Sequence, residues 1–197
     1  MEEALLKSLV WTNYKLFILL CLILPLILSI WGLLAQIPSI QRLLVIFWRV
    51  ASLMAIAIYL FIPVWQVGYL AWFLAHIFVV ISLWFWVDIN DEIKDLPKTA
   101  LKFMVTAWRW AISFYGTISA ISFIPFLPCA FSPDASVEIS CRVWLEAPWH
   151  FKTWFHPNAT PGFLGFLGMT GLIIYGIYFF YFLTFRLIKQ GRIALEQ

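Results

Sequence analysis

Five continuous apolar runs constrain this chain more than any other feature of its sequence. They cover residues 16–34, 43–62, 67–87, 103–127 and 163–185. A helix of roughly 20 apolar residues crosses a hydrocarbon core of about 30 Å. Hydrophobic residues make up 63% of the 197 residues and charged residues only 12%, which is more apolar surface than a soluble domain of this size can bury. We therefore predict an all-α polytopic membrane protein, with five transmembrane helices in a single domain over 1–197.

Composition and motifs also exclude several classes of function. The net charge of +3 is small and scattered along the chain, which argues against a nucleic-acid partner and leaves the lipid bilayer as the first expected one. The sequence has no nucleophile–base pair and none of the GxSxG, HExxH or phosphate-loop motifs. We expect neither enzymatic activity nor a metal site.

The distribution of lysine and arginine predicts the orientation of the chain in the membrane. With five crossings, the N-terminus and the 128–162 loop share one side, whose basic residues are Lys7, Lys15, Arg142 and Lys152. The basic residues of the other side are Arg42, Lys94, Lys98, Lys102, Arg186, Lys189 and Arg192. Because cytoplasmic segments are richer in lysine and arginine, we expect the C-terminus in the cytoplasm and the N-terminus outside or in a lumen.

Two of the three cysteines, Cys129 and Cys141, lie in the 128–162 loop on the expected non-cytoplasmic side. Disulfides persist in such compartments, so we predict a bridge between them. Closing this short loop would stabilise the fold by roughly 3 kcal/mol in the chain-entropy account. Two unpaired thiols are the alternative.

Two arginines, Arg49 and Arg109, lie inside predicted spans and each has a tryptophan beside it. Each is about six residues past the start of its span, or roughly 9 Å deep, where a charge is costly. One possibility is that the side chains reach back to the headgroups. The alternative, which we favour, is an internal ion pair with Asp88 at the cytoplasmic end of the third span.

His76 lies within the third predicted span and is the candidate ligand for a chlorophyll or haem. A single histidine on an aromatic-rich helix is more often a packed polar group. We therefore expect no cofactor and keep pigment binding as an alternative.

The 128–162 loop contains a segment with the character of an interfacial helix. Pro148 suits the first turn of a helix. The aromatic residues that follow are Trp149, Phe151, Trp154 and Phe155, and the last three share one face. The pattern predicts a short helix in the plane of the membrane interface. The alternative is an irregular loop with aromatic belt residues.

Glycines recur along the fifth span. At 100° per residue, Gly165, Gly168 and Gly176 fall within about 80° of one another on a helix. Such a stripe lets a second helix approach closely. The pattern predicts a helix-packing face, used either within this chain or by a partner subunit.

Seven stretches of the sequence have a distinctive composition. They are Leu-Val-Trp-Thr-Asn-Tyr (9–14), Ile-Gln-Arg-Leu-Leu (40–44), Phe-Trp-Arg-Val-Ala-Ser-Leu (47–53), Leu-Trp-Phe-Trp-Val-Asp-Ile-Asn (83–90), Thr-Ala-Trp-Arg-Trp-Ala (106–111), Cys-Arg-Val-Trp (141–144) and Pro-Gly-Phe-Leu-Gly-Phe-Leu-Gly (161–168). Together they resemble a cyanobacterial family of small integral membrane proteins, known only as a domain of unknown function. The resemblance covers nearly the whole chain. It implies a photosynthetic bacterial membrane, either the thylakoid or the plasma membrane, and it brings no catalytic residues.

These observations favour a non-enzymatic accessory or assembly subunit of a membrane complex, which the resemblance implies to be photosynthetic. Other membrane subunits would then be its partners. A pigment- or lipid-binding membrane protein is the first alternative, because His76 and the aromatic residues would serve it. A small anion channel or transporter is the second, because Arg49 and Arg109 could line an anion path.

Overall fold

The computed structural model describes residues 2–132 and 138–194, and within these ranges the chain is helical and contains no strand. Five helical rods are long and apolar enough to cross a membrane, in agreement with the prediction. They are Glu3–Leu34, Pro38–Phe61, Val67–Phe85, Ala100–Ala130 and Pro161–Lys189.

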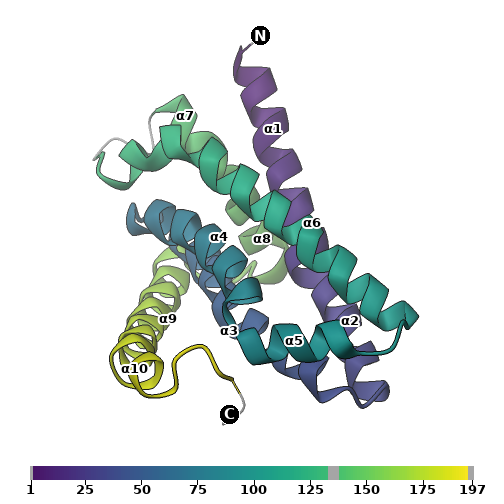
Figure 1. The fold of residues 1–197 in the computed structure, drawn as a ribbon. Helices are drawn as coiled ribbons and strands as arrows, with labels where there is room; N and C mark the ends of the chain where they lie inside the picture. Colours follow the sequence, from purple (N-terminus) through teal and green to yellow (C-terminus); the bar gives the residue numbers. More distant parts are fainter. Residues whose placement is uncertain (1, 133–137, 195–197) are drawn as a thin grey trace.

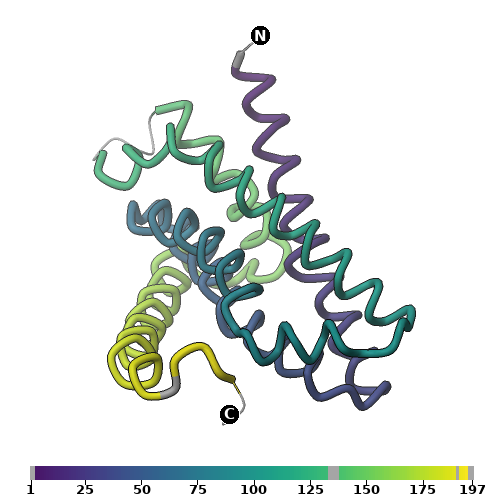
Figure 2. Tube along the Cα trace, viewed as in Figure 1, coloured from purple at the N-terminus to yellow at the C-terminus, as the bar shows by residue number. Residues whose placement is uncertain are grey.

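The first rod consists of α1 (Glu2–Phe17), a π-helical segment η1 (Ile18–Ile23) and α2 (Leu24–Leu34). Pro25 has no backbone N–H to donate, and the hydrogen-bond pattern widens just before it. The rod therefore runs on as one continuous helical element from the N-terminal region to the first turn (Figures 1 and 2).

The centre of the bundle is a hairpin of α3 (Pro38–Phe61) and α4 (Val67–Phe85). Half of the apolar window of each of these two helices is buried, against 22% for the first rod and 17% for the last. The helix α6 (Ala100–Phe123) packs against α4, while α2 and α9 (Pro161–Tyr181) pack against α3. The α3–α4 hairpin is thus the core on which the other spans are assembled (Figure 1).

The third span ends two residues earlier than predicted. The backbone at Trp86 is extended, and a second helix, α5 (Val87–Asp95), begins directly after it. This polar helix runs across the end of the bundle before the chain enters α6 (Figure 1). The break leaves the last carbonyl groups of α4 without partners from its own helix.

The loop between the fourth and fifth spans is folded into short helices. These are η2 (Ile124–Ala130), α7 (Ile139–Arg142), η3 (Val143–Leu145) and α8 (Glu146–Phe155). The predicted short helix corresponds to α8, although it begins at Glu146 rather than at Pro148. Trp149, Trp154 and Phe155 are exposed on it, while Phe151 packs edge-on against the Tyr59 ring of α3. Its position in a membrane interface stays a prediction.

The last rod continues from α9 through η4 (Phe182–Arg186) and α10 (Leu187–Gln190). A Cβ atom added at Gly165 would lie 2.5 Å from Pro63 Cγ, and one at Gly168 would lie 3.1 Å from Tyr59 Cβ. A Cβ at Gly176 meets no atom of the described residues within 4 Å, so Gly176 is not part of the contact with α3, and its use by a partner subunit stays a prediction. Gly171 faces Ile56 and continues the contact of Gly165 and Gly168 at a spacing of three residues, so the contact face turns gradually around α9.

This packing predicts opposite effects for two alanine substitutions in the same helix. Gly165→Ala forces a methyl group against the rigid ring of Pro63 and should lower the free energy of unfolding in detergent by about 1–3 kcal/mol. Gly176→Ala adds its methyl group in open space and should be neutral or stabilising by up to about 1 kcal/mol, because alanine favours a helix more than glycine does. Equal melting temperatures for the two variants would contradict the packing described here.

Candidate functional site

The C-terminal end of α4 is surrounded by a cluster of polar contacts within an apolar bundle. Arg109, on α6, is 4% exposed. Its Nη2 donates to the Leu83 carbonyl at 2.6 Å and to Asn90 Oδ1 at 2.5 Å, and its guanidinium lies 4.1 Å from the centre of the Trp84 ring. The charge is thus held by a backbone carbonyl, a side-chain amide and an aromatic face.

Asn90 links this arginine to the backbone of α4. Its amide nitrogen donates to the Trp84 carbonyl at 3.0 Å while its oxygen accepts from Arg109. Asn90 is therefore the residue that sequence reasoning missed. Asn90 lies among four acidic residues in the 88–95 segment. Nothing in the sequence indicated that its amide, rather than one of these carboxylates, would bind the buried arginine.

The prediction that Arg109 pairs with Asp88 is wrong, because Arg109 binds Asn90 and the Leu83 carbonyl instead. Asp88 Oδ2 accepts the backbone N–H of Ala194 at 2.8 Å, so its carboxylate serves the C-terminal segment instead. The break at Trp86 and the turn into α5 place Asn90, rather than Asp88, against Arg109. The pairing of Arg49 with Asp88 stays a prediction.

The segment after α10 turns back over the same end of α4 (Figure 1). Arg192 Nε donates to the Phe85 carbonyl at 2.7 Å, and the Arg192 carbonyl accepts the N–H of Val87 at 3.1 Å. With Arg109 and Asn90, this arginine binds the carbonyls of residues 83, 84 and 85. Positive charge at a helix C-terminus also complements the helix dipole, so the cluster works as a C-terminal cap built from three distant segments.

A cavity of about 260 Å³ lies between α3, α4 and the α9–α10 rod. Its walls are mostly aliphatic and aromatic side chains, and both Arg49 and Arg186 line it. Arg49 and Arg109 therefore do not share one site, because Arg109 is enclosed by the cap on the other side of α4.

His76 is fully buried and both of its ring nitrogens have partners. Nδ1 lies 2.8 Å from the Trp72 carbonyl, and Nε2 lies 3.3 Å from the Tyr115 hydroxyl. A carbonyl only accepts, so Nδ1 carries the proton, and the lone pair of Nε2 points at Tyr115. Because a pigment metal would need that lone pair, the arrangement argues against the alternative in which His76 is a pigment ligand.

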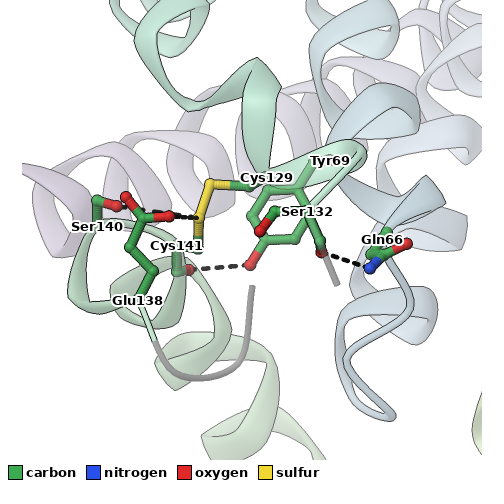
Figure 3. Close-up of a disulfide and its surroundings, with 7 residues drawn as sticks. All are labelled: Gln66, Tyr69, Cys129, Ser132, Glu138, Ser140 and Cys141. Carbon is green, nitrogen blue, oxygen red and sulfur yellow. Dashed lines mark hydrogen bonds between the residues drawn. A yellow bond between two sulfur atoms is a disulfide. The ribbon is translucent and has the colours of Figure 1, made fainter. Parts of the chain in front are cut away.

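Cys129 and Cys141 are joined as a disulfide, as predicted (Figure 3). The bridge ties η2 to α7, and the Tyr69 hydroxyl of α4 donates to the Cys141 carbonyl at 3.0 Å. Gln66, just before α4, donates to the Ser132 carbonyl. The loop between the fourth and fifth spans is thereby attached to the start of α4 (Figure 3).

The same loop also holds the N-terminal part of α1. Lys7 and the indole of Trp11 both bind the carboxylate of Glu146, and the Tyr14 hydroxyl donates to the Trp144 carbonyl at 2.7 Å. Partial burial raises the pKa of the Glu146 carboxyl, but the hydrogen bonds from Lys7 and Trp11 outweigh this effect and leave the pKa below its ordinary value of 4.5. The carboxylate therefore stays ionised and paired at neutral pH.

Residues 7–195 match the family described as a protein of unknown function, DUF3177. The chain belongs to the DUF3177 family. Comparison with curated proteins and with solved structures gives no match. The family match covers the residues of both the helix cap and the cavity, and its description assigns no activity to either.

Because Asn90 is part of the cap, we expect it to contribute more to stability than its charged neighbour Asp91. Asn90→Ala leaves Arg109 buried with one fewer acceptor and should lower the free energy of unfolding by about 1–3 kcal/mol. Asp91→Ala removes an exposed carboxylate from the same helix and should change it by less than about 0.5 kcal/mol. Thermal unfolding in detergent measures both, and equal losses would show that the contact with Arg109 contributes nothing.

Proposed function

We propose that this protein is a non-enzymatic accessory or assembly subunit that binds other membrane proteins through the N-terminal part of α1. The observation that carries the proposal is an apolar stripe on this helix beyond the hydrocarbon core.

The first rod is too long for the bilayer. Its 32 residues span about 48 Å at 1.5 Å per residue, against a hydrocarbon core of about 30 Å. The apolar run over 16–34 fills the core by itself, and charged residues such as Lys7 and Lys15 occur only before it. The segment before residue 16 therefore extends beyond the core, as its position above the rest of the bundle also suggests (Figure 1).

Leucines face outward on this extended segment. Leu5 is 63% exposed and Leu9 is 60% exposed, and with Thr12 and Leu16 they follow the four-and-three spacing of one helix face. Inside the hydrocarbon such residues would face lipid. Outside it they are an apolar stripe on a helix that Glu146 and Trp144 hold in place, which is typical of a docking face for another helix.

Pigment binding and anion transport have less support. Pigment binding at His76 would require breaking its contact with Tyr115. An anion path would require exposed arginines along a passage, whereas Arg109 is held in the cap of α4. The photosynthetic membrane belongs to our proposal on the strength of the sequence resemblance alone.

We propose further that the N-terminus lies outside or in a lumen and the C-terminus in the cytoplasm. The bias of lysine and arginine supports this orientation, and so does a disulfide in the loop of the same side. An impermeant maleimide should label Ser8→Cys in sealed right-side-out membranes, and should label Lys98→Cys only after permeabilisation. Both positions are exposed, so the reverse pattern would contradict the orientation.

Replacing the exposed leucines should release the partner without unfolding the protein. The variant Leu5→Gln/Leu9→Gln should lose about tenfold or more of a co-purifying membrane subunit in mild-detergent affinity purification, while its melting temperature stays within a few degrees of the wild type. Ala4→Gln, an exposed position off the leucine face, is the matched control and should retain the subunit. Identical sets of co-purifying proteins for both variants would overturn the proposal.

A further inference from the structure

The cavity beside α4 exists because α9 approaches α3 closely along only part of its length. Small residues allow the contact from Gly165 to Gly171. Beyond Gly171 the residues of the rod that face the hairpin are large, including Tyr175, Phe179 and Phe182, and these line the cavity. The rod is therefore held away from α3 and α4 at this end, and a space remains between them.

The walls of this space suit a hydrocarbon chain. Ile46 and Val50 come from α3, Phe78 and Phe85 from α4, and Leu183 from η4. Ile81 and Tyr178 also line it, yet they remain 52% and 46% exposed, so the cavity opens at the outer surface between α4 and α9. Because α4 and α9 both belong to rods long enough to cross a membrane, the surface between them faces the bilayer. A lipid acyl chain can enter the cavity from this side.

Two arginine side chains place positive charge at the wall of this cavity. Arg49 comes from α3 and Arg186 from the opposite wall near the end of the last rod. A guanidinium has five N–H donors, so each arginine can bind an anionic oxygen while it keeps its other contacts. Two cations beside an apolar groove complement a molecule with one anionic group and an apolar tail.

We propose that this cavity binds a membrane phospholipid with a net negative headgroup. One acyl chain lies between α4 and the last rod, and Arg49 and Arg186 bind the phosphate. A cavity of about 260 Å³ lies just below the range of ~300–1,000 Å³ typical of small-ligand pockets, which fits part of one chain rather than a whole lipid. The site uses other residues than the leucine stripe of α1 and stands independently of the partner proposed above.

The test uses the purified full chain in neutral detergent with added dioleoyl-phosphatidylglycerol or dioleoyl-phosphatidylcholine. Native mass spectrometry measures bound lipid and thermal unfolding measures stabilisation. We expect phosphatidylglycerol to bind about tenfold more tightly than phosphatidylcholine, and Arg49→Gln/Arg186→Gln to abolish this preference. Arg142→Gln, which removes an exposed arginine from the outer loop, is the matched control and should leave the preference unchanged.

A second variant tests the acyl-chain part of the site. Val50→Phe fills the cavity and should weaken the binding of both lipids severalfold, and it keeps the proposal testable if the double arginine variant does not fold. Equal binding of the two lipids by the wild type would overturn the proposal, as would a preference that survives the loss of both arginines. Stabilisation by inorganic phosphate equal to that by phosphatidylglycerol would also overturn it, because the site would then recognise an anion without the chain.

Discussion

The cap on the C-terminal end of α4 is the interaction on which much of this bundle depends. A helix that ends inside an apolar bundle leaves carbonyl groups that need donors. Here Arg109, Asn90 and Arg192 supply them, and they come from α6, α5 and the segment after α10. The cap thus solves a local hydrogen-bonding problem and at the same time fixes three separate segments around the central hairpin.

The opposite end of α4 is held by different chemistry. There the disulfide, Tyr69 and Gln66 attach the outer loop to the start of the helix, and Glu146 of the same loop binds Lys7 and Trp11 of α1. Both ends of one central helix are therefore tied to peripheral segments. The middle of the bundle needs only apolar packing, which is why its peripheral rods can remain largely exposed to lipid.

The five spans were predictable from the sequence because the length of an apolar run is set by the thickness of the bilayer. The cysteine pair was predictable because both residues lie in one short loop. The partner of Arg109 was not, because the break at Trp86 decides which residue of the 88–95 segment faces α6. Gly176 lies outside the contact with α3 for a related reason: periodicity shows which glycines share a helix face, but not where along α9 the contact with α3 ends. The cavity begins where that contact ends, so its position was not predicted from the sequence either.

The contact between Arg192 and the Phe85 carbonyl has a consequence for biosynthesis. The two residues are separated by 107 positions, so the carbonyl at the end of α4 receives this donor only after two further spans and the loop between them have been synthesised. Until then the third span sits in the translocon or the membrane with part of its terminus open. Insertion of the hairpin and completion of the cap at the end of α4 are therefore separate steps, and the interval between them sets how long water, lipid headgroups or a chaperone must occupy those carbonyls.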